Sequence, residues 1–257
     1  MVRSGAPGFH GVPAYHRPGR CDSTMIEVVA FDADDTLWDN ERLYLDAQDR
    51  LQELLAPYDP DRQALRLLEA LESENVNHYG FGIKSFALSM IEVATEVCAR
   101  RTDVGIIQEV LQIGKSMLSA QVKLMGGVEA VLGDLSTRYR LMLITMGDAS
   151  EQEVKIDRAG VGKYFNYIEI VGEKSARRYA EILHKYSIHP EDFVMVGNSV
   201  RSDILPVIEI GGRAVQIPFA RTWARENVPE QERRGLRFER VPSLKELPAC
   251  LERLSAR

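Results

Sequence analysis

Short apolar segments alternate with helix-forming segments over the second half of this chain, and no other feature limits the possible folds as strongly. Four segments rich in β-branched and apolar residues are predicted strands: 140–145, 167–171, 193–196 and 214–217. The segments between and beside them are predicted helices: 128–139, 150–159, 175–186 and 202–210. Strands joined by single helices pair in parallel, so this pattern predicts an α/β fold, a doubly wound, mainly parallel Rossmann-like sheet with helices on both faces.

A fifth strand is predicted at residues 26–31 (IEVVAF), far from the other four along the chain. Four helices and no strand are predicted in the segment that follows it: 43–55, 64–71, 85–99 and 104–122. We therefore expect an inserted helical cap domain at residues 40–125 within an α/β core domain at residues 25–39 and 126–257. Ligands of open α/β sheets bind at the carboxyl ends of the strands, so the insertion is expected to cover the site as a lid.

Charge and cysteine content argue against several classes of function. The net charge of −6 and the pI near 5.5 disfavour a nucleic-acid or anionic-membrane partner, and no apolar segment reaches the roughly 18 residues that cross a bilayer. Cys21, Cys98 and Cys250 lie far apart, which is typical of free thiols in a reducing cytoplasm. Residues 1–24 are rich in Gly and Pro without periodicity, and this segment is predicted to be a disordered tail.

Four aspartates follow the first predicted strand within eight residues: Asp32, Asp34, Asp35 and Asp39. Alternation along an extended chain places residues 32 and 34 on the same side, so both carboxylates can face one ligand. A carboxylate can attack phosphorus to form an acyl phosphate, and a second carboxyl group can protonate the leaving alkoxide. The alternative is a loop of solvated aspartates that caps the next helix, and the Asp-x-Asp pair alone does not decide between the two.

The segment FDADDTL, residues 31–37, resembles the first motif of the haloacid dehalogenase superfamily, an apolar strand followed by Asp-x-Asp-x-Thr. The resemblance implies that Asp32 is the nucleophile that accepts a phosphoryl group. It also implies that Asp34 is the general acid and base and that Thr36 helps to hold the turn. Dehalogenases of this superfamily lack the second aspartate, so the presence of Asp34 favours phosphoryl chemistry.

Two further segments resemble superfamily motifs, each at the end of a predicted strand. Thr145 ends LMLIT and is followed by Met146, and the resemblance implies that these residues bind phosphoryl oxygens. Lys174 lies just before a predicted helix, where the superfamily's lysine neutralises the phosphate and the nucleophile. The proline that usually follows this lysine is Ser175 here, which can cap the helix instead. Taken alone, Thr145 would be interpreted as a plain strand-end residue and Lys174 as an ordinary surface lysine.

The segment VMVGNSVRSDI, residues 194–204, resembles the fourth motif, Gly-Asp-(four residues)-Asp, with Asn198 and Asp203 at the acidic positions. The resemblance implies a Mg²⁺ site formed by Asp32, the main-chain carbonyl of Asp34 and a side chain of this motif. Magnesium prefers oxygen ligands, and an amide oxygen can serve, but it contributes no charge and is expected to weaken metal affinity. We predict that Asn198 and Asp203 both line the metal site, and which of them ligates the metal directly stays open.

The motifs together predict a Mg²⁺-dependent phosphomonoester hydrolase, a monomer or homodimer, that acts on a small phosphorylated metabolite through a phospho-Asp32 intermediate. One alternative is a phosphotransferase or mutase on the same site. Another is a catalytically weakened protein that binds a phosphorylated ligand, which Asn198 suggests.

The segment NHYGFGIKSF, residues 77–86, has two glycines around an aromatic residue in the predicted cap. One interpretation is a substrate-specificity loop in which His78, Tyr79 and Lys84 reach over the active site, with Lys84 available to an anionic group. The other is an ordinary connection between two helices with Phe81 packed inward.

Overall fold

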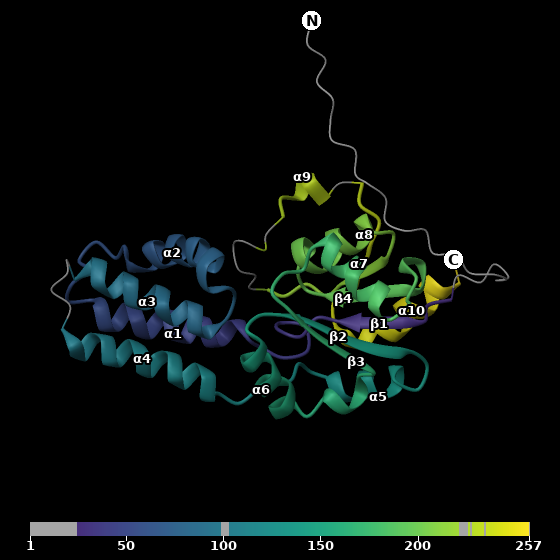
Figure 1. Ribbon diagram of the computed structural model, residues 1–257, viewed down its shortest axis with the longest axis horizontal. Helices are drawn as coiled ribbons and strands as arrows, with labels where there is room; N and C mark the ends of the chain where they lie inside the picture. The colour runs from purple at the N-terminus through teal and green to yellow at the C-terminus, as the bar shows by residue number, and fades with distance from the viewer. Residues whose placement is uncertain (1–24, 99–102, 221–225, 227, 234, 257) are drawn as a thin grey trace, which may run out of the picture.

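The computed structural model describes residues 25–98, 103–220, 226, 228–233 and 235–256. Its centre is one sheet of six parallel strands in the order β3-β2-β1-β4-β5-β6 (Figure 1). The strands are β1 (Val28–Phe31), β2 (Arg140–Met146), β3 (Tyr167–Val171), β4 (Phe193–Gly197), β5 (Arg213–Gln216) and β6 (Glu239–Arg240). This is the strand order of a dinucleotide-type doubly wound sheet, in which the order reverses between β1 and β4.

Helices cover both faces of the sheet. They are α5 (Val128–Leu135), α6 (Ala149–Ala159), α7 (Ala176–Lys185), α8 (Leu205–Glu209), α9 (Glu230–Arg233) and α10 (Leu247–Ser255). Short helical turns join them: η1 (Gly162–Tyr164), η2 (Pro190–Asp192), η3 (Val200–Ile204) and η5 (Leu244–Glu246). Alternate residues of β1 serve the two faces: Val29 packs with α5, α6 and α10, whereas Val28 packs with α7 and α8. A central strand that is buried on both faces explains the uninterrupted apolar run of its sequence.

A four-helix unit follows β1 and lies to one side of the sheet (Figure 1). It consists of α1 (Glu41–Leu55), α2 (Ala64–Tyr79), α3 (Ile83–Val97) and α4 (Val104–Ser119). Its apolar side chains, among them Leu51, Phe86 and Met90, form one hydrophobic cluster. This cluster is separate from the two hydrophobic clusters on the two faces of the sheet. The unit therefore has a hydrophobic core of its own.

Two paired segments connect the four-helix unit to the sheet. The outgoing segment 37–39 runs antiparallel to the returning segment 123–125, with a β-bridge between Trp38 and Leu124. The amide of Asp39 donates to the carbonyl of Lys123 at 3.0 Å, and the amide of Met125 donates to the carbonyl of Leu37 at 2.8 Å. These hydrogen bonds hold both connections together directly beside the end of β1.

The predicted fold class is confirmed, but several elements differ from the prediction. Helices α9 and α10 were not predicted, and α5 ends at Leu135 instead of residue 139. Helix α2 continues to Tyr79, although the apolar pattern predicted its end near residue 71. Asn75 explains the extension, because its amide donates to Ser89 and Glu92 of α3 and so fixes a polar segment by tertiary contacts. Strand β6 was not predicted, since its two residues, Glu239 and Arg240, carry no strand signal. The predicted tail at residues 1–24 lies outside the described residues.

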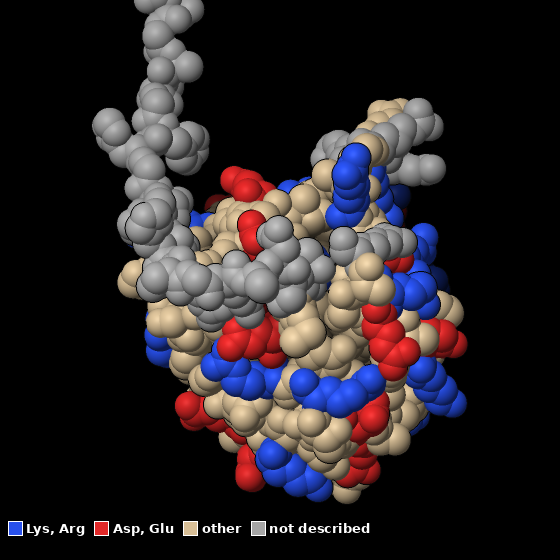
Figure 2. All heavy atoms as spheres, turned by 90° about the vertical axis from the view of Figure 1, so that its right-hand side faces the viewer, with Lys and Arg blue, Asp and Glu red and all other residues tan. Residues whose placement is uncertain are grey.

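The surface carries charges of both signs. Figure 2 shows Lys and Arg side chains interspersed with Asp and Glu on the face away from the four-helix unit. No helix in the described part of the chain has both the length and the apolar character needed to cross a bilayer. Cys98 and Cys250 are buried and form no disulfide within the described part of the chain.

Candidate active site

The carboxyl ends of β1, β2 and β4 meet at one edge of the sheet, beneath the four-helix unit. Phe31 at the end of β1 is in register with Leu143 and Val196 of its two neighbours, so the residues that follow each strand lie side by side. A cavity opens there between the sheet and the four-helix unit, and Asp32, Asp34 and Lys174 are among the residues that line it. Four segments far apart in the sequence thus contribute to one site.

A buried ion triad forms the centre of the site. The Lys174 ammonium lies 2.5 Å from Asp32 Oδ1 and 2.7 Å from Asp203 Oδ1, and all three side chains are at least nine-tenths buried. Burial favours the neutral amine, but the facing Asp203 and Asp32 outweigh it and raise the pKa of Lys174 well above its ordinary value. Burial also raises the pKa of Asp203 to about 7, despite the opposing effect of Lys174. When both buried carboxylates are ionised, a single shared ammonium leaves the centre with excess negative charge.

Asp203 reaches the centre through a tight approach to the main chain. Its second oxygen, Oδ2, accepts from the amide of Ser199 at 3.0 Å, so both oxygens of this carboxylate have protein donors. A side chain at Gly197 could not fit, because a Cβ there would lie 2.2 Å from Asp203 Oδ2. As predicted, Ser175 caps the helix after Lys174, accepting from the amide of Arg178 at 3.2 Å.

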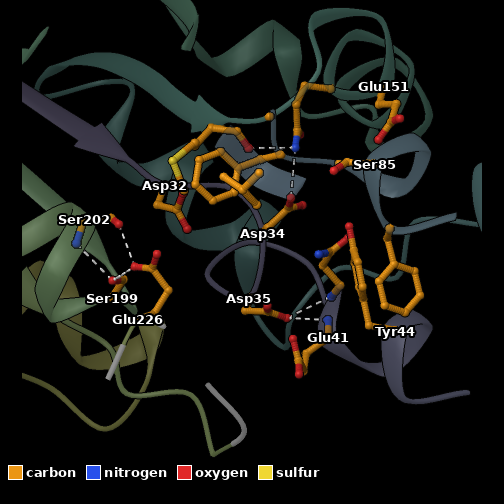
Figure 3. A pocket seen from close by; sticks show the side chains of 18 of the residues that line it. Asp32, Asp34, Asp35, Glu41, Tyr44, Ser85, Glu151, Ser199, Ser202 and Glu226 are labelled. Carbon is orange, nitrogen blue, oxygen red and sulfur yellow. Dashed lines mark hydrogen bonds between the residues drawn. The ribbon is translucent and has the colours of Figure 1, made fainter. Parts of the chain in front are cut away.

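Thr36 connects the first and fourth motifs. Its hydroxyl donates to Asp32 Oδ2 at 3.0 Å and lies 3.4 Å from Asn198 Oδ1. Asp35 has a left-handed backbone with φ of 61°, which turns the chain, and its carboxylate accepts from the amides of Asn40 and Glu41 at 2.9 Å each (Figure 3). Asp35 therefore shapes the turn and caps the start of α1.

Helix α6 holds the second aspartate, a contact that the sequence did not reveal. Asp34 accepts from Lys155 Nζ at 2.7 and 2.6 Å, from Gln152 Nε2 at 2.9 Å and from Trp38 Nε1 at 2.5 Å. Gln152 and Lys155 are three residues apart and so share one face of the helix. The sequence offered one indication of this contact: both residues belong to the helix that directly follows β2, close to the carboxyl ends of the strands.

The oxygen atoms around Asp32 fit a magnesium ion. A carboxylate oxygen of Asp32 and the amide oxygen of Asn198 both lie within 3.4 Å of the Thr36 hydroxyl, and these are hard donors of the kind that Mg²⁺ prefers. The excess negative charge of the triad also favours a cation. Among the described residues, no group of three or more His, Cys, Asp or Glu side chains is arranged to hold a metal. A metal here therefore depends on an amide or main-chain oxygen in addition to carboxylates.

The end of β2 forms another part of the cavity wall on the side of the sheet. Met146 and Gly147 line the cavity, whereas Thr145, one residue earlier, is buried with 1% of its surface exposed. The Met146 carbonyl accepts from Gln152 Nε2 at 3.2 Å. Thr145, Met146 and Gly147 thus lie at the predicted strand end, beside Gln152 of α6, which also donates to Asp34.

The predicted specificity residues lie elsewhere. His78 and Tyr79 are exposed at the end of α2 and are not among the described residues that line the cavity, because α2 continues past the predicted boundary. Lys84 contacts the core instead, with its Nζ 2.9 Å from Asp148 Oδ1 and 3.0 Å from Ser150 Oγ. The Ser150 hydroxyl and Lys84 together lower the pKa of Asp148 to about 2. Phe81, between the two glycines, does line the cavity.

Glu151 of α6 joins the four-helix unit to the core. Its buried carboxylate accepts from the amides of Ile83 and Lys84 at 2.8 and 3.1 Å, which satisfies free donors at the first turn of α3. Residue 82 must be glycine for two reasons: its φ is 134°, and a Cβ there would lie 2.7 Å from Glu151 Oε2. This close approach explains the second of the two glycines in the predicted loop.

The roof of the cavity is acidic and aromatic. Glu41, Tyr44, Glu72, Phe81 and Phe86 line it from the four-helix unit, and Figure 3 shows Glu41 and Tyr44 extending from α1. The rings of Tyr44 and Phe86 meet edge to face, with centroids 4.9 Å apart. Burial, with smaller contributions from Glu41 and Glu69, raises the pKa of Glu72 to about 7.

Replacing Glu72 with Gln is expected to stabilise the protein at alkaline pH. The pKa of Glu72 is near 4.5 in the unfolded chain and about 7 in the folded protein. Its ionisation therefore destabilises the folded state as pH rises above 4.5, and this destabilisation reaches its full size above pH 7. The free energy of unfolding of Glu72→Gln should therefore exceed that of the wild type by about 1–3 kcal/mol at pH 8 and by much less at pH 5. Urea denaturation at both pH values measures the difference. The exposed Glu74→Gln on the same helix is the control, and an equal gain there would contradict the explanation.

Comparisons with known proteins agree with this geometry. A family model described as haloacid dehalogenase-like hydrolase matches residues 26–211. A haloacid dehalogenase-like family hydrolase from Xanthomonas campestris superposes with a TM-score of 0.80 at 35% identity, covering 90% of this chain and 97% of that one. The chain therefore belongs to the haloacid dehalogenase-like hydrolases, as its motifs predicted.

Two curated relatives are phosphatases. The chain is 27% identical over 156 residues to N-acylneuraminate-9-phosphatase of Homo sapiens, covering 58% of this chain and 60% of that protein. It is also 27% identical over 237 residues to glyceraldehyde 3-phosphate phosphatase of Methanothermobacter thermautotrophicus, covering 88% of this chain and all of that protein. The match to the human relative thus spans about three fifths of that relative's length.

Proposed function

We propose that this protein hydrolyses small phosphomonoesters through a phospho-Asp32 intermediate. The observation that carries the proposal is the buried Asp32 carboxylate, fixed by Lys174 and Thr36 at the mouth of a cavity and followed two residues later by Asp34. A nucleophile of this kind needs a nearby cation and a proton donor for the leaving group, and both lie within the same cavity.

The two steps assign each side chain a task. Asp32 attacks phosphorus, the bond from phosphorus to the leaving oxygen breaks, and Asp34 gives that oxygen a proton. A water molecule then attacks phosphorus and passes a proton to Asp34, which releases phosphate and restores the Asp32 carboxylate. Lys174 remains charged throughout and neutralises the additional negative charge.

Magnesium is the proposed cofactor, held by Asp32, the main-chain carbonyl of Asp34 and Asn198. When bound, Mg²⁺ neutralises charge on the phosphoryl oxygens. Asn198 is assigned the direct contact because its amide oxygen lies beside the Thr36 hydroxyl that also contacts Asp32. Asp203 is assigned an indirect role, because its oxygens accept from Lys174 and the Ser199 amide, whereas the Asn198 oxygen lies beside the Thr36 hydroxyl.

The roof supports a polyhydroxy leaving group. Among the described lining residues, Lys155 and Lys174 belong to the core, and the four-helix unit contributes Glu41 and Glu72 but no lysine or arginine. Carboxylates accept hydrogen bonds from hydroxyl groups and repel a second anion. The two relatives described above are named for small phosphorylated compounds, N-acylneuraminate 9-phosphate and glyceraldehyde 3-phosphate, which supports a metabolite of this size.

A panel of phosphomonoesters tests the proposed function. We expect Mg²⁺-dependent phosphate release, faster from sugar and polyol phosphates than from phosphoglycolate, whose carboxylate the roof repels. Phosphate release is measured with and without EDTA, and sugar phosphate products are analysed for isomers. Formation of an isomer without phosphate release would favour a mutase. Tight binding of phosphorylated ligands without any turnover would favour a binding protein.

A further inference from the structure

The orientation of Asp34 is set by side chains from a different part of the chain. Lys155 Nζ lies 2.7 and 2.6 Å from the two carboxylate oxygens, so a single ammonium contacts both. Gln152 and Trp38 each add one donor to the same carboxylate. The carboxyl group therefore has four hydrogen bonds that together fix its plane, and only one of the donors, Trp38, is near it in sequence.

Lys155 is itself held in place. Its side chain is 13% exposed, and its third hydrogen bond goes to Asn40 Oδ1 at 3.1 Å, which uses the full donor capacity of an ammonium group. An ion pair that is mostly shielded from water, with defined geometry, restricts motion far more than an exposed pair does. Within the described part of the chain, the Lys155 ammonium donates to Asp34 and Asn40 and not to the buried triad, so its effect is directed to Asp34.

The same turn of α6 also contacts the four-helix unit. Glu151, one residue before Gln152, accepts from the first amides of α3. Helix α6 thus has two roles. It anchors the four-helix unit through Glu151, and it orients Asp34 through Gln152 and Lys155. Asp34 is consequently held in place from the cavity wall and not only by the loop that contains it.

We propose that Lys155 is a positioning residue that holds the Asp34 carboxyl group in the orientation needed for proton transfer to the leaving oxygen and from water. This role rests on the proposed function, because it acts through the general acid and base of that reaction. It differs from the role of Lys174, which faces the nucleophile. General acid–base catalysis contributes about 10²–10⁴-fold, and a misplaced carboxyl group forfeits part of that factor.

A double-mutant cycle tests the proposal. The proteins are the wild type, Lys155→Met, Asp34→Ala and the double variant, assayed with p-nitrophenyl phosphate and glycerol 1-phosphate at saturating Mg²⁺. Lys155→Met should lower kcat about 10–100-fold and change KM less than about threefold, because substrate binding by Lys174 is untouched. In the Asp34→Ala background the same substitution should change kcat by less than about threefold, because the group on which Lys155 acts is absent.

Three further measurements make the result decisive. Lys155→Arg keeps the charge and should recover a large part of kcat, which also answers the case in which Lys155→Met does not fold. The exposed Lys115→Met in α4 should match the wild type. A structure of Lys155→Met should show Asp34 displaced. An undiminished kcat in Lys155→Met, or an equal loss in both backgrounds, overturns the positioning role while the wild type still turns over. A wild type without turnover overturns the proposed function and this role with it.

Discussion

Asp32→Asn should lower the phosphomonoesterase activity at least about 10³-fold, because an amide cannot attack phosphorus to form the acyl phosphate. The substitution keeps the shape of the side chain, and burial already raises the pKa of Asp32, so a neutral group is tolerated at this position. Phosphate release at saturating Mg²⁺ and substrate measures the loss, and thermal unfolding establishes that the variant is folded.

The matched control for this variant is Asp49→Asn, which neutralises an exposed aspartate on α1. It should retain wild-type activity. The nucleophile can also be identified directly, since mass spectrometry of protein quenched in acid during turnover should find phosphate on the peptide that contains Asp32. Substantial residual turnover in Asp32→Asn, with no phosphorylated peptide in the wild type, would contradict the proposed intermediate.

Asn198→Asp should raise the affinity for Mg²⁺ by about tenfold or more. A carboxylate adds a full negative charge next to the cation, and two opposite charges a few ångströms apart near a protein surface interact by several kcal/mol. Isothermal titration of the protein with MgCl₂ measures the dissociation constant, and the Mg²⁺ concentration for half-maximal activity provides a second measurement. Without the metal, the variant should melt at a lower temperature than the wild type, because the new carboxylate repels Asp32 and Asp203.

Asp203→Asn is the contrasting variant. Because Asp203 contacts Lys174 and the Ser199 amide, its substitution should lower kcat at saturating Mg²⁺ and leave the metal affinity much less affected. The pair of variants thus separates the two acidic positions of the fourth motif. An unchanged Mg²⁺ dissociation constant in Asn198→Asp, together with a large change in Asp203→Asn, would reverse the assignment of direct and indirect ligand.

Much of the fold could be predicted because its cause is local. Apolar runs such as residues 140–145 are buried on both faces wherever they lie in a parallel sheet, and alternation with helices fixes the parallel pairing. The triad was also within reach, because Asp32, Lys174 and Asp203 belong to segments whose order and positions at strand ends match superfamily motifs. Polar segments gave no such signal, and for that reason the end of α2 and strand β6 were missed.

Tertiary structure alone decided how the site is completed. The sequence places Lys155 on the helix that follows the second strand of the sheet, but it does not indicate that the ammonium lies against Asp34, 121 residues away along the chain. Likewise Lys84, predicted to face the substrate, is paired with Asp148, and only the packing of α3 against α6 decides this. The sequence by itself determined which strands form and which charged groups stand at their ends, since burial and alternation act over a few residues. The partner of each charged group depends on the folded path of the whole chain, because a hydrogen bond requires contact within about 3 Å, and sequence distance does not encode that contact.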